Sequence, residues 1–416
     1  MAIETVSPVS LMSERISLML TGLIGGEGVC LRAETRDRQG EVWRSEVVFE
    51  VPASGVVDLS VQAPSSGSYS GVDAAGLIWG MCPRDDLDYA YFESPDDGFD
   101  VTLTAEQPGH VPEQAALHRL TRRPDLTRLE VREAGLHGIL FMPPGPVRGA
   151  VLELGGSEGG LYETRAALLA SHGFLVLALG YFALPGLPEQ VINVPLEYFG
   201  RALAWLRARP EWNGGRVGVL GTSKGGELAL LLGTTYPEDV GAVVGVVPSG
   251  LVFEGIDRVG NHPPGVPMSS WSLGGQPLPY ISYIVKDWSE YFSGPPPVAL
   301  TPAHQSAVAA AAPATLEAAR IRVENIRGPV LLVSGGDDQV WQSTELANIA
   351  QAGLETSGGE VVHLTRPDAG HLLSVPGLPT FVRSAWSTSG GTPAANAHLQ
   401  QLAWESTLDT LARARF

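Results

Sequence analysis

The sequence has 416 residues, of which 44% are hydrophobic and 17% charged, with a formal net charge of −18. This length predicts two or more domains, and this composition is typical of a globular protein with a large buried core. The acidic balance argues against nucleic-acid binding, which needs clustered Lys and Arg. The two cysteines, Cys30 and Cys82, are too few for a disulfide framework, and their spacing is not that of a metal site.

The first residues, MAIETVSPVSLMSERISLML, carry acidic side chains and lack a basic region followed by an apolar run, so no secretory signal is expected. No stretch of roughly 18 apolar residues is free of charges and prolines, so no membrane-spanning helix is expected. The last residues, LDTLARARF, lack the peroxisomal Ser-Lys-Leu address. These features together predict a cytoplasmic protein.

Short, often alternating apolar segments, separated by Gly, Ser and Asp turns, fill residues 13–105. Several strands at such a spacing predict an immunoglobulin-like β-sandwich. Residues 105–123 are rich in Pro, Gln and His and resemble a linker. We therefore place an N-terminal sandwich domain at residues 1–122 and expect both cysteines in its core.

Residues 123–416 form the second predicted domain, of the α/β class. A hairpin pattern at 126–145 precedes short apolar runs that alternate with helical segments, near 162–171, at 196–207 and from 224 onward. Continuous apolar strands between helices predict a mostly parallel sheet covered on both faces. Residues 250–318, called the insertion below, interrupt this pattern with Pro-, Gly- and Ala-rich sequence; either a substrate lid or an inert surface excursion fits it.

The motif Gly221-Thr222-Ser223-Lys224-Gly225 carries the clearest chemical signal. A chance G-x-S-x-G is expected in a glycine-rich chain, but this one follows the apolar strand RVGVL and precedes the helical run GGELALLLG. That context defines the nucleophile elbow of α/β-hydrolases, in which a sharp turn exposes the serine hydroxyl above the sheet. We therefore predict Ser223 as a catalytic nucleophile, with the backbone N–H of Lys224 as one oxyanion donor.

A serine nucleophile needs a histidine base and a carboxylate that orients it, and in this fold they follow in the order Ser, Asp, His. The segment PVLLVSGGDDQVW is an apolar strand that ends in two adjacent aspartates. We favour Asp338 over Asp337 because Val340 and Trp341 follow it, as in a common turn of such enzymes.

The segment EVVHLTRPDAGHLL supplies two candidates for the base. His371 follows Gly370 in a loop after a predicted strand, which suits a catalytic histidine. His363 lies inside the strand pattern, where a structural histidine is expected. We therefore predict His371 as the base.

The second oxyanion donor is expected in the loop after the first parallel strand, at residues 154–160. Its four glycines allow a close backbone approach, and we predict the N–H of Ser157 or Glu158. The loop matches neither of the common phosphate-binding glycine patterns. The Lys224 side chain either assists an anionic substrate or is solvated beside the nucleophile, and we favour the second interpretation.

The same residues resemble a known family, the acyl-CoA thioesterases related to bile acid-CoA:amino acid N-acyltransferase, which join an N-terminal β-sandwich to an α/β-hydrolase domain. The resemblance runs over most of the chain. Its segments are GSYSGVDAAGLIW at 67–79, GGLYETRAALLASHGFLVLALGYF at 159–182, the elbow GTSKGGELAL, GGDDQVWQSTE at 335–345 and DAGH at 368–371. In the family the second aspartate of the Asp-Asp segment is the triad acid, which supports Asp338. Glu158 departs from the family, which often has glycine there, and residues 250–320 align poorly.

The resemblance implies an acyl-CoA thioester substrate. The predicted triad would hydrolyse it through an acyl-enzyme, and this mechanism requires neither metal nor organic cofactor. Family members that conjugate amino acids tend to carry cysteine at the nucleophile position, so Ser223 favours water as the acceptor. The alternatives are an ester or lactone hydrolase with the same triad, an amino-acid N-acyltransferase, and a catalytically silent binding module. The expected partner is a small-molecule thioester or ester, without nucleic acid or a membrane span, and a homo-oligomer is left open. The charge of −18 repels CoA phosphates at long range, so a local basic patch is needed.

Overall fold

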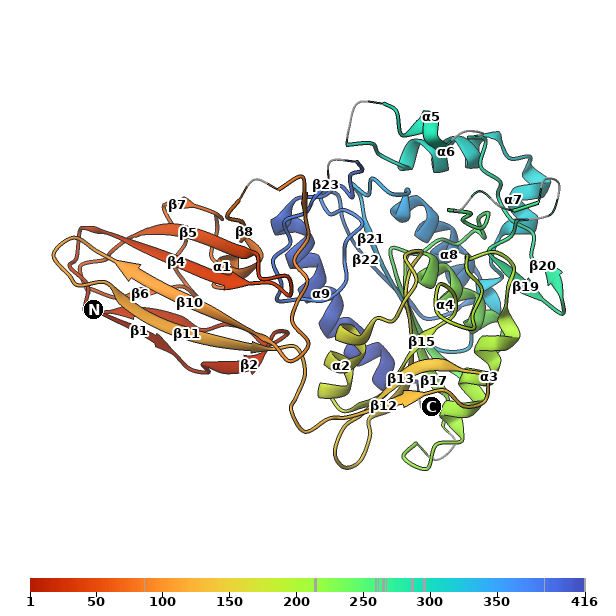
Figure 1. Cartoon of the computed structure of the whole chain (residues 1–416), viewed down its shortest axis with the longest axis horizontal. Helices are drawn as coiled ribbons and strands as arrows, with labels where there is room; N and C mark the ends of the chain where they lie inside the picture. The colour runs from red at the N-terminus through yellow and green to blue at the C-terminus, as the bar shows by residue number, and fades with distance from the viewer. Residues whose placement is uncertain are drawn as a thin grey trace. The chain divides into compact units, whose positions relative to one another are not determined.

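The computed structural model describes residues 1–85, 87–212, 215–258, 260, 262–263, 266, 268–285, 288–294, 297–384 and 386–414 (Figure 1). The chain divides into two compact units. The β unit comprises Met1–Pro124, Val375–Ala385 and Thr392–Gln401; the α/β unit comprises Asp125–Ser374, Trp386–Gly391 and Leu402–Phe416.

Two sheets of mainly antiparallel strands form the β unit. The smaller sheet has the order β1-β3-β6, and the larger β2-β11-β10-β4-β5-β7, with β8 also paired to β5. The strands are β1 (Ala2–Thr5), β2 (Val9–Leu11), β3 (Leu18–Thr21), β4 (Gly28–Arg36), β5 (Val42–Glu50), β6 (Val57–Asp58), β7 (Ser66–Gly67), β8 (Cys82–Pro83), β10 (Phe99–Glu106) and β11 (Glu113–Leu120).

Alternation of side chains explains why this unit folds into stacked sheets. Along β4, β5 and β10 every second residue is buried, so each strand turns one face to the core. Short elements complete the unit: α1 (Gly76–Trp79), and β9 (Tyr89–Ala90) paired with β23 (Arg383–Ser384). The arrangement agrees with the predicted β-sandwich, and its immunoglobulin-like character stays a prediction.

Two expectations for this unit were wrong. The supposed linker at 105–123 contains strand β11, which pairs with β10 from Phe99↔Arg119 to Ala105↔Glu113. Arg119 anchors it, because its buried guanidinium donates to Ser10 Oγ and to the carbonyls of Met12 and Glu14. Neither cysteine is a core residue: Cys82 is exposed and Cys30 only half-buried, and both are free thiols.

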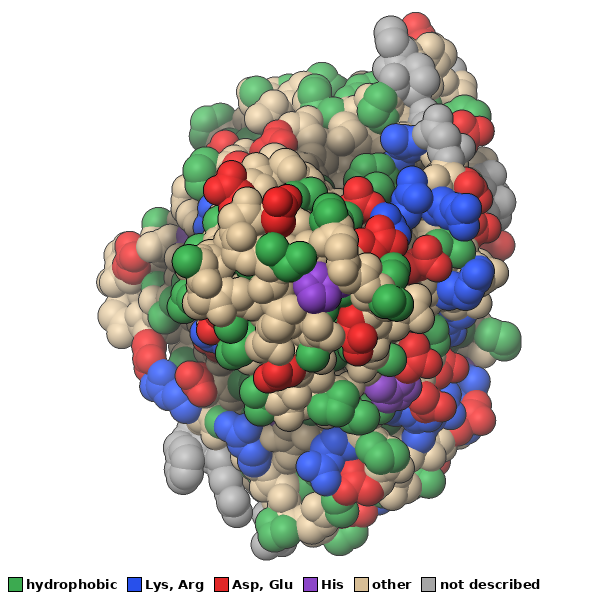
Figure 2. All heavy atoms as spheres, turned by 90° about the vertical axis from the view of Figure 1, so that its left-hand side faces the viewer, with side chains coloured by type: hydrophobic (Ala, Val, Ile, Leu, Met, Phe, Trp, Pro, Cys, Tyr) green, Lys and Arg blue, Asp and Glu red, His purple; other side chains and the backbone are tan. Residues whose placement is uncertain are grey.

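The face turned towards the viewer in Figure 2 carries interspersed acidic and basic side chains rather than one block of a single sign. In the β unit several of these charges are paired at the surface, for example Arg32 with Glu46 and Arg122 with Asp97. Such exposed pairs contribute little to stability, about 0–1 kcal/mol each.

An eight-stranded sheet organises the α/β unit, in the order β12-β13-β15-β14-β17-β18-β21-β22. The predicted hairpin β12–β13 and the pair β13–β15 are antiparallel, and the remaining neighbours are parallel. The strands are β12 (Thr127–Val131), β13 (His137–Met142), β14 (Gly149–Leu154), β15 (Phe174–Gly180), β17 (Val217–Thr222), β18 (Val240–Val246), β21 (Val330–Gly335) and β22 (Val361–Arg366).

Every residue of β14, β15, β17, β18 and β21 is buried, which confirms the mostly parallel sheet predicted from continuous apolar runs. The connecting helices are α2 (Glu163–Ser171), α3 (Leu196–Arg207), α4 (Lys224–Thr235) and α8 (Ser343–Ser357), and the long α9 (Pro393–Ala412) closes the chain. Within the described residues, no helix combines the length and apolar character that a membrane crossing demands.

The described part of the insertion is ordered into short elements: β19 (Trp271–Leu273), β20 (Gln276–Pro277), α5 (Trp288–Tyr291), α6 (Thr301–Ala310) and α7 (Pro313–Ala319), followed by the 3-10 turn η1 (Val323–Asn325). Strand β19 pairs in parallel with β16 (Val194–Pro195), which leads into α3. Phe253, Ile281 and Ala307 of the insertion share a buried cluster with Trp341 and Leu346. The insertion is therefore packed onto the α/β unit rather than projecting from it.

Candidate active site

Ser223 occupies the sharp turn between β17 and α4, with φ +56° and ψ −119°. An ideal Cβ at Gly221 would lie 1.9 Å from the Gly225 carbonyl oxygen, and one at Gly225 would lie 2.2 Å from the Gly155 carbonyl oxygen. Both positions therefore require glycine. A positive φ at a serine costs free energy and persists only where the surroundings enforce it, as at many active sites.

Hydrogen bonds hold this turn on both sides. The Ser223 N–H donates to the Val246 carbonyl at 2.8 Å, and its own carbonyl accepts from Gly226 at 2.8 Å and Glu227 at 3.0 Å. The first N–H groups of a helix lack intrahelical acceptors and carry the positive end of its dipole. The Lys224 N–H is at this position, directly after the serine.

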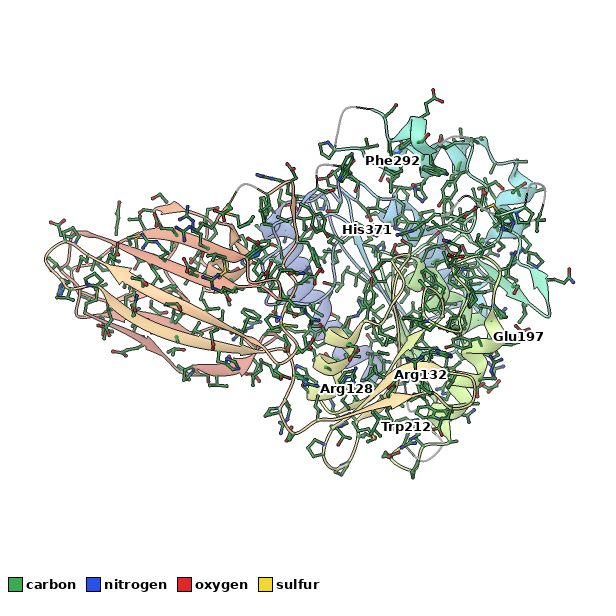
Figure 3. The ribbon with its side chains drawn as sticks, in the orientation of Figure 1. Arg128, Arg132, Glu197, Trp212, Phe292 and His371 are labelled. Carbon is green, nitrogen blue, oxygen red and sulfur yellow. The ribbon has the colours of Figure 1, made fainter. Side chains whose placement is uncertain are left out.

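The structure brings the three predicted triad side chains into one hydrogen-bond chain. His371 Nε2 lies 3.1 Å from Ser223 Oγ, and His371 Nδ1 lies 3.0 and 2.8 Å from the two carboxylate oxygens of Asp338. His371 follows β22 (its ring is labelled in Figure 3), and its backbone N–H donates to the Ser389 carbonyl at 2.8 Å. Asp338 and the imidazole are both buried.

Asp338 is held as a hydrogen-bond acceptor. Its Oδ1 accepts the backbone N–H groups of Val340 at 2.9 Å and Trp341 at 3.2 Å. An acceptor carboxylate fixes the proton of His371 on Nδ1, which leaves the Nε2 lone pair for the serine hydroxyl. Asp337 points elsewhere and accepts from the Gly391 N–H and the Gln339 amide.

The competing histidine, His363, sits on β22 between two partners. Its Nε2 lies 2.7 Å from Ser334 Oγ, and its Nδ1 lies 2.8 Å from the side-chain oxygen of Gln351. Burial lowers its pKa, which favours the neutral ring. Because both ring nitrogens are occupied at a distance from Ser223, His363 has the structural role expected from the strand pattern.

The glycine loop after β14 approaches the elbow through Gly155 and Gly156. Tyr181 is buried beneath it and donates its hydroxyl to the Gly155 carbonyl at 2.8 Å. An ideal Cβ at Gly156 would lie 3.3 Å from the Thr222 carbonyl oxygen. Ser157 is half-buried and Glu158 exposed, so their N–H groups as oxyanion donors stay a prediction.

The favoured interpretation of the Lys224 side chain, solvation beside the nucleophile, was wrong. The side chain is 3% exposed, and its Nζ lies 2.9 Å from both carboxylate oxygens of Glu227, which is fully buried. Burial lowers the pKa of Lys224 and raises that of Glu227, and the ion pair opposes both shifts. Sequence reasoning assigned no role to Glu227, although this acid interrupts the mainly apolar run GGELALLLG.

A second buried ion pair was also missed. Arg165 of α2 donates through Nε to Glu153 of β14 at 2.8 Å and through Nη1 to the Thr222 hydroxyl. Glu153 precedes the glycine loop and Arg165 follows it, so one guanidinium ties both ends of the loop to the residue before the nucleophile. The signal in the sequence was a charged residue inside the apolar run GAVLELG.

An aromatic cluster packs beside His371 through Trp341. The Trp341 ring centroid lies 6.2 Å from that of His371, and its indole N–H donates to the Val247 carbonyl at 3.0 Å. Phe253 and His304, both from the insertion, pack on Trp341 with centroid separations of 6.0 and 5.7 Å. Burial lowers the pKa of His304 to about 4, so this histidine is neutral at physiological pH.

Two family models match this chain. A family model described as "BAAT / Acyl-CoA thioester hydrolase C terminal" matches residues 194–414. A second, described as "Acyl-CoA thioester hydrolase/BAAT N-terminal region", matches residues 13–133. Together the two matches include residues of both units and leave residues 134–193 outside.

Curated relatives match over nearly the full length. Acyl-coenzyme A thioesterase 6 of Mus musculus is 31% identical over 95% of this chain and 92% of its own length. Mitochondrial acyl-coenzyme A thioesterase 2 of Mus musculus is 31% identical over 95% of this chain and 85% of its own length. The peroxisomal succinyl-coenzyme A thioesterase of the same species is 28% identical over 96% of this chain and 93% of its own length. Among solved structures, dienelactone hydrolase from Anabaena variabilis matches 69% of this chain and 99% of its own, with 19% identity and a TM-score of 0.37.

Proposed function

The chain belongs to the acyl-CoA thioester hydrolase/BAAT family, and from this premise we propose that it hydrolyses acyl-CoA to a free acid and CoA with Ser223, His371 and Asp338 as its catalytic triad. One observation carries the assignment of the residues. The Ser223 hydroxyl, the His371 imidazole and the Asp338 carboxylate form a continuous hydrogen-bond chain at a strained turn.

Acylation begins when His371 Nε2 takes the hydroxyl proton while Ser223 Oγ attacks the thioester carbonyl carbon. The tetrahedral intermediate carries its negative charge on the former carbonyl oxygen. Its collapse breaks the carbon–sulfur bond, and the imidazolium of His371 returns the proton to the departing CoA thiolate. Asp338 keeps the imidazole in the working tautomer and stabilises its charged form.

Deacylation repeats these steps with water. His371 removes a proton from a water molecule that attacks the acyl-serine, and then protonates Ser223 Oγ as the free acid leaves. The oxyanion of both steps is held by the Lys224 N–H and a donor from residues 155–160, with Ser157 and Glu158 as the proposed residues and Gly156 as a third candidate from its position beside Thr222.

Replacement of Ser223 tests this assignment. Ser223→Ala should lose nearly all acyl-CoA turnover while retaining the wild-type circular dichroism and unfolding transition. A fluorophosphonate should label the wild type at Ser223 and leave the variant unlabelled. Retained turnover in Ser223→Ala, or labelling elsewhere in the wild type, would refute the triad.

The acyl acceptor and the substrate class are tested together. Mass spectrometry of Ser223 after exposure to mixed acyl donors identifies both the nucleophile and the acyl group it accepts. Rates on acyl-CoA and aryl ester panels distinguish a thioesterase from an ester hydrolase, and an amide product with added glycine or taurine would reveal acyl transfer. We expect thioester hydrolysis without amide product, because the nucleophile is serine.

We also propose that residues 1–122 and 123–416 are separate domains, that the insertion shapes the substrate region, and that the protein is cytoplasmic. Two free thiols, Cys30 and Cys82, support a reducing compartment. Because named relatives include mitochondrial and peroxisomal proteins, localisation of the tagged chain by microscopy is the test.

A further inference from the structure

The buried ion pair next to the nucleophile joins helix α4 to the insertion. Glu227 Oε1 accepts the indole N–H of Trp271 at 2.7 Å as well as the Lys224 ammonium. Lys224 Nζ lies 3.4 Å from the Phe253 carbonyl oxygen and 6.0 Å from the ring centroids of both Phe253 and Trp271. Trp271 and Phe253 are both insertion residues, so the pair lies where the insertion meets the nucleophile helix.

Full pairing makes Lys224 a poor contact for a phosphate of CoA. The ammonium faces two carboxylate oxygens and a backbone carbonyl, and the side chain is 3% exposed. Moving it to the surface would leave Glu227 buried without its cation, which is strongly unfavourable. An anionic ligand would compete with Glu227 for the same charge.

Phe253 and Trp271, which contact the Lys224–Glu227 ion pair, are connected by ring contacts to different parts of the catalytic site. The Phe253 ring packs on Trp341 at 6.0 Å, and Trp341 packs on His371 at 6.2 Å. The Trp271 ring lies 5.9 Å from Tyr181, whose hydroxyl donates to the Gly155 carbonyl in the glycine loop. Contacts of the insertion therefore run to the base on one side and to the oxyanion loop on the other.

We propose that Lys224 and Glu227 are positioning residues that fix the insertion, through Phe253 and Trp271, as a rigid wall beside the acyl group of the substrate. This inference rests on the proposed thioesterase function. The ion pair holds the wall at one distance from Ser223, and the wall thereby determines which acyl groups react. Binding of the CoA moiety does not involve the Lys224 ammonium.

Trp271→Phe is the mildest test, because it keeps an aromatic ring while it removes the donor to Glu227. The change also removes part of the ring volume, a loss that the control variant below shares. Lys224→Met and Glu227→Gln perturb the ion pair directly. Each is assayed on acyl-CoA substrates of graded chain length and on the matching pantetheine thioesters, which lack the nucleotide phosphates. Fluorophosphonate titration of Ser223 corrects all rates for the active fraction.

Trp212→Phe is the matched control. Its indole N–H donates to the Gly215 carbonyl at 2.8 Å, and Trp212 lies at the opposite end of the α/β unit from His371 (Figure 3). This control variant should keep the wild-type chain-length profile, since it also loses one buried indole donor but leaves the insertion untouched.

The expected result is a flattened chain-length preference: the ratio of kcat/KM between the best and worst acyl groups should fall at least threefold in Trp271→Phe and further in Glu227→Gln. The ratio of KM between CoA and pantetheine substrates should stay within twofold of wild type. An unchanged profile would overturn the proposal, as would a wild type without any chain-length preference.

A rise in KM confined to CoA substrates in Lys224→Met would also overturn it, by placing the ammonium on a phosphate. Failure of the proposed function gives a different result, namely no wild-type turnover of any thioester. Wild-type rates therefore test the proposed function, and the chain-length profiles and KM ratios of the variants test the positioning role.

Discussion

Replacement of Arg165 by Met removes the guanidinium that links both ends of the glycine loop to Thr222. The Arg165 side chain is 3% exposed and that of Glu153 is fully buried, so the variant leaves a carboxyl group in the core without its cation. Breaking a buried ion pair from one side costs about 3–5 kcal/mol of the free energy of unfolding. We expect a loss of this size for Arg165→Met at pH 8.

The loss should depend on pH with a defined sign. Burial raises the pKa of Glu153 to about 7 even beside Arg165, and without Arg165 the pKa rises further. A raised folded-state pKa stabilises the fold where the carboxyl is protonated, and this stabilisation is lost as the pH rises through the folded pKa. The destabilisation by Arg165→Met should therefore be smaller at pH 6 than at pH 8.

A double variant separates folding from positioning. Replacing both partners of a buried pair by apolar residues is often neutral or stabilising, so Arg165→Met/Glu153→Leu should recover most of the stability that Arg165→Met loses. It should not recover activity, because the link from the glycine loop to Thr222 is still missing. A displaced oxyanion donor lowers kcat by about 10- to 100-fold.

Two assays are needed. Urea unfolding is followed through loss of fluorophosphonate labelling at Ser223, because the chain has two units and this signal reports the α/β unit alone. Activity is measured as kcat per titrated active site. Arg128→Met is the control (Arg128 is labelled in Figure 3). Arg128 of β12 pairs at 2.8 Å with Glu163 of α2, the helix that carries Arg165, but both side chains of this pair are more than a third exposed. It should cost about 1 kcal/mol or less. Recovery of kcat together with stability in the double variant would refute a positioning role for Arg165.

Three further changes give separate readouts. Asp338→Asn should lower kcat about 10³- to 10⁴-fold, whereas Asp337→Asn should lower it less than tenfold; equal losses, measured by steady-state kinetics, would contradict the choice of the triad acid. Gly225→Ala should abolish labelling of Ser223 by fluorophosphonate, because the new Cβ would overlap the Gly155 carbonyl oxygen at 2.2 Å. Normal labelling would show that the glycine loop can move without loss of the active geometry. His304→Phe should make the free energy of unfolding less dependent on pH in the acidic range. Burial lowers the folded-state pKa of His304 to about 4, so the wild type should lose up to about 3 kcal/mol of this free energy as the pH falls from about 6.5 to 4. Urea unfolding across this range measures the difference.

Elements and residues that a short local sequence pattern identifies could be predicted from the sequence. The expected helix at 196–207 coincides with α3, and the hairpin before the parallel sheet is present as β12–β13. The three proposed triad residues lie in segments that each carry a local signature, and the order of those segments along the chain follows from the fold. Their meeting in space then depends on the parallel sheet, which the apolar runs predict.

Residues whose roles depend on distant partners could not be predicted. Lys224 has no local feature that distinguishes a buried side chain from a solvated one, because Trp271 joins the cluster from 44 residues beyond Glu227. Strand β11 was hidden by the Pro, Gln and His residues of the supposed linker, and its pairing with β10 is what defines it. In both cases tertiary contacts override the local signal.

Two buried ion pairs flank the nucleophile, one through Thr222 before it and one through Lys224 after it. Burying four charged groups is expensive, and an apolar core of similar volume would often be more stable. Apolar packing is not directional, however, whereas a guanidinium or an ammonium with carboxylate partners fixes the positions of the chains that carry them. Ser223 needs such directional support because its backbone is held at φ +56°, a conformation that relaxes unless both neighbours are held. We infer that the pairs are retained for the geometry of the elbow rather than for the stability of the fold.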